Sequence, residues 1–149
     1  MADLNTSRHA LPYLAVAQAQ KEITHNEALA LIDALLHPVV QGQVSTPPSV
    51  SNADLGKCWL VSSDASGIWT GREGQISLWT GGSWRFLVPV LGMRIRNAAY
   101  NFDYVWTGSA WLAAPNVANP QSGNVVDEEA RAAINTLLAH FRMIGLLVA

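Results

Sequence analysis

The six tryptophans are the residues of this 149-residue chain with the clearest chemical potential, and all of them lie between positions 42 and 116. Aromatic rings can stack on the apolar faces of sugars, so exposed tryptophans on a β-sheet would suit carbohydrate binding. The same rings could instead pair across β-hairpins and form the core of a small sheet. Both interpretations concern the same four residues, which are Trp79, Trp84, Trp106 and Trp111.

Other patterns that carry chemistry are sparse. No two of the four histidines are spaced i, i+4, and Cys58 is the single cysteine, so we predict no metal site within one chain. Cys58 lies at the start of an expected strand, where a lone cysteine is usually a small buried hydrophobe. We predict no catalytic residues and no cofactor. A polysaccharide hydrolase remains an alternative, and it would need a carboxylate pair drawn from Asp64, Glu73 and Asp103.

Composition excludes several classes of protein. The formal net charge is −2 and no basic block is present, which argues against a nucleic-acid partner. No apolar run reaches the roughly 20 residues of a membrane span, and the first residues contain no signal-peptide core. We therefore expect synthesis in a cytoplasm without membrane insertion. Only 13% of the residues are charged while 50% are hydrophobic, which indicates a surface covered by copies of the chain or by another protein.

Three segments must position these residues. Residues 1–41 contain no glycine, and we predict an N-terminal helical anchor there. A capping box at residues 24–27 predicts a helix start, Pro38 predicts its end at about His37, and a short helix or extended arm could precede it at residues 13–21. Leu31 and Leu35 lie on its apolar face, and we predict that they contribute to an oligomer interface.

Residues 42–116 predict a Trp- and Gly-rich domain of antiparallel β-hairpins. The sequence Trp-Thr-Gly-Gly-Ser-Trp at 79–84 recurs as Trp-Thr-Gly-Ser-Ala-Trp at 106–111, and a weaker third copy begins at residue 68. Each copy has apolar flanks around a glycine turn, as in a hairpin. Shorter strands are expected at 59–61 and 94–96. The overall prediction is an α+β fold with a helix at each end.

Residues 117–149 predict a linker and a C-terminal oligomerising helix. Asp127 is suited to the N-cap, and Gly145 to the left-handed position after the last turn. The apolar positions follow a short heptad pattern, which could pack on the chain's own β domain or against the same helix of sister subunits. The predicted interface residues on this helix are Ile134, Leu137, Leu138, Phe141 and Ile144.

Three motifs stand near the N-terminus: Leu-Pro-Tyr-Leu at 11–14, Gln-Ala-Gln-Lys at 18–21 and Thr-His-Asn-Glu-Ala-Leu at 24–29. Together with the Gly- and Trp-rich centre and the segment at 127–135, they resemble an uncharacterised family found in alphaproteobacterial phages, prophages and gene transfer agents. The resemblance implies a virion structural protein, such as a short fibre or spike or its base or adaptor in a head or tail. It implies no catalytic residues.

The resemblance also implies partners. We expect a homo-oligomer, a trimer because fibres usually are, docked on capsid or tail and baseplate proteins of a particle. Host surface polysaccharide is a further expected partner, which agrees with the alternative of a carbohydrate-binding module that uses exposed tryptophans.

Overall fold

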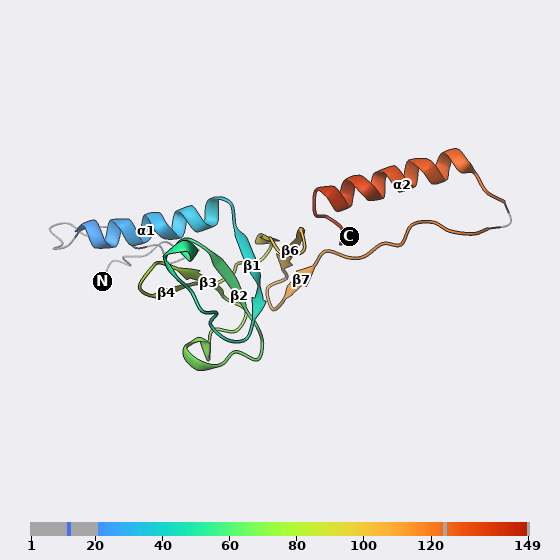
Figure 1. The fold of residues 1–149 in the computed structure, drawn as a ribbon. Coiled ribbons are helices and arrows are strands. Elements are labelled where there is room, and N and C mark those ends of the chain that lie inside the picture. Colours follow the sequence, from blue (N-terminus) through green and yellow to red (C-terminus); the bar gives the residue numbers. More distant parts are fainter. Residues whose placement is uncertain (1–11, 13–20, 124, 149) are drawn as a thin grey trace.

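The structure is a computed structural model that describes residues 12, 21–123 and 125–148. It confirms the α+β class. Within these described residues, two helices flank seven strands, and two short 3-10 turns lie between strands (Figure 1). In chain order the elements are α1 (Lys21–Leu36), β1 (Val39–Val44), η1 (Asn52–Asp54), β2 (Cys58–Val61), η2 (Gly67–Trp69), β3 (Ile76–Trp79), β4 (Trp84–Leu87), β5 (Arg94–Asn97), β6 (Phe102–Trp106), β7 (Trp111–Ala113) and α2 (Glu128–Met143).

The strands form one sheet in the order β4-β3-β2-β1-β5-β6-β7. β1 is the central strand and runs parallel to both of its neighbours, β2 and β5. Every other neighbouring pair is antiparallel, so β1 joins two three-stranded meanders. The sequence boundary predicted at residue 41 falls inside β1. The predicted boundary is therefore corrected: the first helix and the sheet share one core, and they do not form an anchor and a separate domain.

Helix α1 covers one face of the sheet. Leu31 is only 8% exposed and packs with Val40 and Leu60, and Leu35 packs against the same cluster. The side chains of Leu31 and Leu35 therefore pack against residues of their own chain. The helix also runs through Thr24, so the predicted start at the capping box is wrong. Threonine is tolerated inside a helix, and packing of one face outweighs a local capping preference. Residues 13–20, where a preceding helix was considered, lie outside the described residues.

The two predicted hairpins are present and their turns are equivalent. In the β3–β4 turn, the backbone N–H and the hydroxyl of Thr80 both donate to the carbonyl of Ser83. In the β6–β7 turn, Thr107 makes the same two bonds to the carbonyl of Ala110. The weaker third copy is not a hairpin, because its tryptophan, Trp69, ends the 3-10 turn η2 and is buried.

The opposite face of the sheet carries a tryptophan core. Residues of β2 alternate between the two faces, so Cys58 and Leu60 face α1 whereas Trp59 and Val61 face the other side. Trp69 joins them from the loop between β2 and β3. The loop therefore closes this face as α1 closes the other.

Candidate functional site

The four candidate tryptophans form two cross-strand pairs, as the core interpretation predicted. Trp79 faces Trp84 across β3 and β4, and Trp106 faces Trp111 across β6 and β7. The ring centroids are 5.1 Å apart in the first pair and 5.3 Å in the second. Both pairs therefore stabilise their hairpins, and only their surroundings distinguish them.

The surroundings of the two pairs differ. Trp84 also meets Trp59 and Trp69 edge to face, with centroids 5.4 Å and 5.1 Å away. The ring of Trp84 is thus part of the tryptophan core on the face of the sheet opposite α1. Trp106 and Trp111 instead border a groove of about 320 Å³ between the β6–β7 turn and the loop that joins β2 to β3. The lining residues are Gln43, Val61, Ser63, Glu73, Gly74, Trp106, Ser109, Ala110 and Trp111.

Hydrogen bonding fixes the groove's shape. The indole Nε1 of Trp111 donates to the carbonyl of Gly74 over 2.8 Å, which ties β7 to the loop before β3. Gly74 has a φ of +75°, and a Cβ there would lie 3.2 Å from Trp106. A glycine is thus suited both to the backbone angle and to the close ring. Because Gly74 and Ser63 lie far along the chain from the hairpin, no spacing in the sequence revealed this groove.

One charged group lies on the groove. Glu73 is exposed, and hydrogen bonds from its own backbone amide and from that of Gly71 lower the pKa of its carboxyl. The carboxylate is therefore ionised at neutral pH and makes the groove negative. Aromatic rings beside an amide, hydroxyls and one carboxylate can bind a ligand that presents both apolar C–H surface and hydroxyl groups.

The other two candidate carboxylates have local partners. Asp64 accepts a hydrogen bond from the Ser62 hydroxyl, which lowers the pKa of the aspartate. Asp103 forms an ion pair with Arg96 at 3.0 Å. Of the three carboxylates, only Glu73 lines the aromatic groove.

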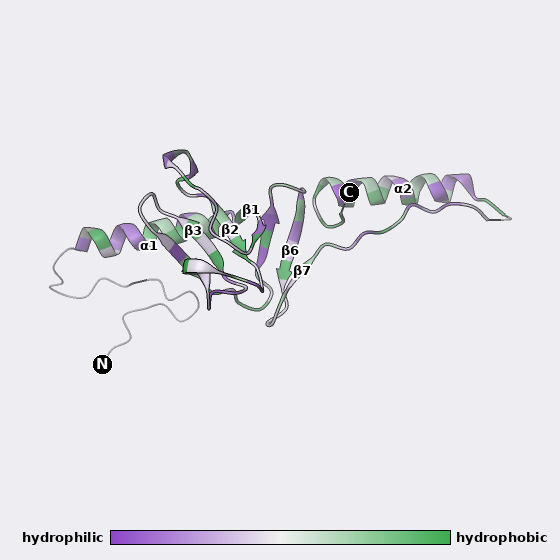
Figure 2. Cartoon of the chain, turned by 60° about the horizontal axis from the view of Figure 1, so that its bottom comes forward, coloured by the Kyte–Doolittle hydropathy of each residue, from purple (hydrophilic) through white to green (hydrophobic). Residues whose placement is uncertain are grey.

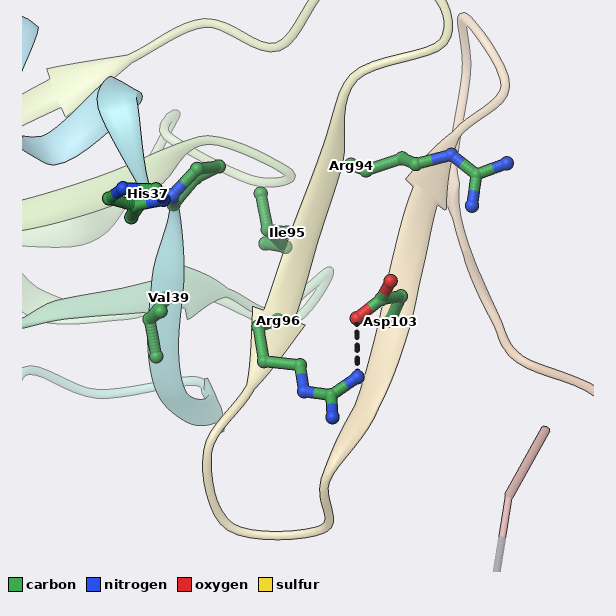
Figure 3. Close-up of a pocket in the computed structure, with 7 residues that line it drawn as sticks. His37, Val39, Arg94, Ile95, Arg96 and Asp103 are labelled. Atoms are coloured by element: carbon green, nitrogen blue, oxygen red, sulfur yellow. Dashed lines mark hydrogen bonds and ion pairs between the residues drawn. The ribbon is translucent and has the colours of Figure 1, made fainter. Parts of the chain in front are cut away.

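A second cavity, of about 250 Å³, lies where the end of α1 meets β5 and β6 (Figure 3). His37, Arg94, Arg96 and Asp103 give it the polarity of an anion site. However, Arg96 is bound to Asp103, and in Figure 3 Arg94 extends away from His37. Arg96 also donates to the Asn101 side chain and to the carbonyl of Ile144. The amide of Asp103 donates to the carbonyl of Gly145 over 3.0 Å, so Arg96 and Asp103 together hold the chain at the end of α2.

Helix α2 projects from the sheet at the end of an extended strap, of which residues 114–123 and 125–127 are described (Figure 1). Asp127 caps its first turn by accepting from the amide of Ala130 at 2.9 Å, as predicted. The amides of Gly145 and Leu146 bond back to the carbonyls of Arg142 and Phe141, with Gly145 in the left-handed region at φ +79°. This is the Schellman pattern, so the predicted helix end is also confirmed.

One face of α2 lies against the strap. Arg131 donates to the carbonyl of Ser122, and Arg142 donates to Val117 and Asn119. Leu138 shares this face by helical spacing and is the one buried residue of α2. Leu138 is therefore packed within its own chain.

The neighbouring face of α2 is apolar and exposed. Figure 2 shows hydrophobic residues along this helix among hydrophilic ones. We call it the apolar stripe, and its members are separated by three or four residues, as one side of a helix requires. Their exposed fractions are Ile134 46%, Leu137 54%, Phe141 42% and Ile144 52%. Of the predicted interface residues, these four are the ones whose side chains remain available.

Cys58 is 4% exposed, which confirms the interpretation of this residue as a small buried hydrophobe. Burial, with a smaller effect of the Asp33 charge, raises the pKa of its thiol to about 12. Because the thiolate is the reactive form, we expect no modification of the folded protein by iodoacetamide at pH 8, and rapid modification in urea. Mass spectrometry measures both. Alkylation of the folded chain at the rate of the unfolded chain would contradict the burial.

The described residues form an α+β protein with a mixed seven-stranded sheet. It carries an aromatic groove beside the β6–β7 turn and a projecting C-terminal helix. Within the described ranges, no three His, Cys, Asp or Glu side chains are grouped to hold a metal, and no helix is long and apolar enough to cross a membrane. Residues 25–112 match the model of the family described as protein of unknown function, DUF2793. More than half of the chain matches, so it belongs to this family. No curated protein matches the chain.

Proposed function

We propose that this protein is a structural component of a phage or phage-like particle, a short fibre or spike or its base or adaptor, which oligomerises through α2. The observation that carries the proposal is the apolar stripe, four large side chains exposed on a helix that the rest of the fold holds away from its core. Such a face is typical of a surface that another protein covers. The chain's 13% charged residues agree with extensive coverage.

The proposed occupant of the stripe is the same stripe of sister subunits. A seam of residues at alternating spacings of three and four is the pattern of short helix bundles. The helix has 16 residues, too few to be stable alone in water, but both of its ends are already held by the strap and by Arg96. A bundle would therefore form at a smaller cost in conformational entropy. Three copies and docking on a capsid or tail platform are parts of this proposal.

The proposal is tested by the mass of the protein in solution, from light scattering coupled to size exclusion. We expect an oligomer, and we expect Leu137→Asp and Phe141→Asp each to weaken it at least about 100-fold, because an uncompensated buried charge costs about 3 kcal/mol or more.

The matched control is Ala139→Asp, which adds the same charge to an exposed residue on the far side of α2 from Leu137 and should leave the oligomer intact. A wild-type monomer at all concentrations, or an oligomer that both stripe variants preserve, would contradict self-association through α2.

A second candidate function is contact with host surface polysaccharide. The observation that favours it is the groove beside Trp106 and Trp111, which has the aromatic and polar lining of a sugar site. The family match spans the groove and ends before α2, so the two candidate functions use different parts of the chain. Both functions can operate in one protein, because a spike can assemble through a helix and bind sugar through its sheet.

A further inference from the structure

We propose that the groove beside Trp106 and Trp111 binds a short segment of a glycan that carries no acidic groups, made of neutral or amino sugars. This inference rests on the second candidate function and names its ligand class. It is carried by the ring positions, the polar lining and the charge of the groove.

The two rings are fixed before any ligand arrives. Trp111 is held by its hydrogen bond to the Gly74 carbonyl, and it packs against the core on the face of the sheet that α1 covers. The indole N–H of Trp111 is occupied by this hydrogen bond, so only the carbon surface of the ring is available to a ligand. Trp106 is restrained by its ring contact with Trp111, and it lies so close to Gly74 that a Cβ there would be 3.2 Å from the Trp106 ring. Prior ordering of these rings lowers the entropy cost of binding, which matters for a weakly held ligand such as a sugar.

Polar groups come from three separate elements around the rings. Gln43 lies on β1, Ser63 follows β2, and Ser109 lies in the β6–β7 turn. An amide and two hydroxyls supply both donors and acceptors, which is what the hydroxyls of a sugar require. A volume of about 320 Å³ is at the low end of ligand pockets. The groove therefore suits a short stretch of a polysaccharide rather than a long extended chain.

The charge of the groove selects among glycans. Glu73 is the one charged side chain among the described lining residues, and no lysine or arginine lies there. Its neighbour Arg72 is placed over the ring of Phe86, 5.0 Å from the ring centroid. Because Glu73 is ionised at neutral pH, a uronate or sulfate would meet repulsion with no compensating cation. A neutral sugar would not, and a glucosamine ammonium would be attracted.

Binding is measured by tryptophan fluorescence and by NMR titration with four trisaccharides. Maltotriose and triacetylchitotriose are neutral, the glucosamine trimer is basic and trigalacturonate is acidic. We expect binding of a neutral or basic trimer, with trigalacturonate at least tenfold weaker than the best of them. In Glu73→Gln, which retains the acceptor for the Gly71 amide, this discrimination should fall to less than threefold. The charge-matched control Glu128→Gln, remote on α2, should keep it.

The position of the site is tested by Trp106→Ala, which should abolish binding, with Tyr100→Ala as the exposed aromatic control. Because Trp106→Ala could unfold the hairpin, Gln43→Ala provides an independent test at an exposed position and should weaken binding at least fivefold. Binding that survives both variants would overturn the site. Binding of no trimer would overturn carbohydrate binding as a function, whereas tightest binding of trigalacturonate would overturn only the ligand class.

Discussion

Replacement of Gly145 by alanine is expected to detach the end of α2 from the sheet. Gly145 has φ +79°, which costs a residue with a Cβ about 1–2 kcal/mol. A Cβ there would also overlap the Arg96 guanidinium, 2.6 Å from Cζ and closer still to Nη1. Arg96 would have to leave its bonds to Asp103 and the Ile144 carbonyl. We expect a total loss of about 3 kcal/mol in unfolding free energy.

Urea denaturation and hydrogen exchange of the α2 amides check this expectation. Gly92 is a matched control, because its φ is also +79° but a Cβ there would meet nothing within 4 Å. Gly92→Ala should therefore show only the backbone cost. In an Arg96→Ala background, Gly145→Ala should cost no more than Gly92→Ala, since the overlap is gone. Equal effects of the two glycine substitutions in the wild-type background would show that Arg96 is not a clamp on α2.

Replacement of Trp69 by alanine is expected to cost about 3–5 kcal/mol, the usual range for loss of a fully buried tryptophan. Trp69 is 0% exposed and meets Trp84 edge to face at 5.1 Å. Its Nε1 has no hydrogen-bond partner among the described residues. Trp69→Phe should therefore cost clearly less than Trp69→Ala, because phenylalanine keeps most of the ring contact and removes the unpaired donor.

Equilibrium unfolding followed by far-UV circular dichroism measures these losses, and the near-UV signal reports on packing of the remaining tryptophans. The adjacent Ile68 provides the control, since it is 70% exposed and its change to alanine should stay within about 0.5 kcal/mol. If Trp69→Ala and Ile68→Ala destabilise the protein equally, the tryptophan core does not hold this face of the sheet together.

The features of this fold that rest on local interactions could be predicted from the sequence alone. The limits of α2 follow from Asp127 and Gly145, whose cap and left-handed turn involve neighbours a few residues away. The two hairpins follow from their Thr-Gly turns, in which the threonine bonds a residue three positions on. The burial of Cys58 likewise followed from its place at the start of an apolar strand.

The features that join distant segments could not be predicted from the sequence, because they depend on contacts made in the folded chain. The parallel pairing of β1 with β2 and β5 depends on partners far along the chain. Three of the six residues of β1 are valines, but Gly42 interrupts them and weakens the local strand signal. Contacts with distant segments also place Trp69 in the core instead of in a hairpin. Such contacts likewise bring Glu73 and Trp106 together in one groove. Local spacing reports only on neighbours within a few positions. The groove and the Arg96 clamp instead depend on distant residues, because Gly74 and Trp111 are 37 positions apart and Arg96 and Ile144 are 48 positions apart.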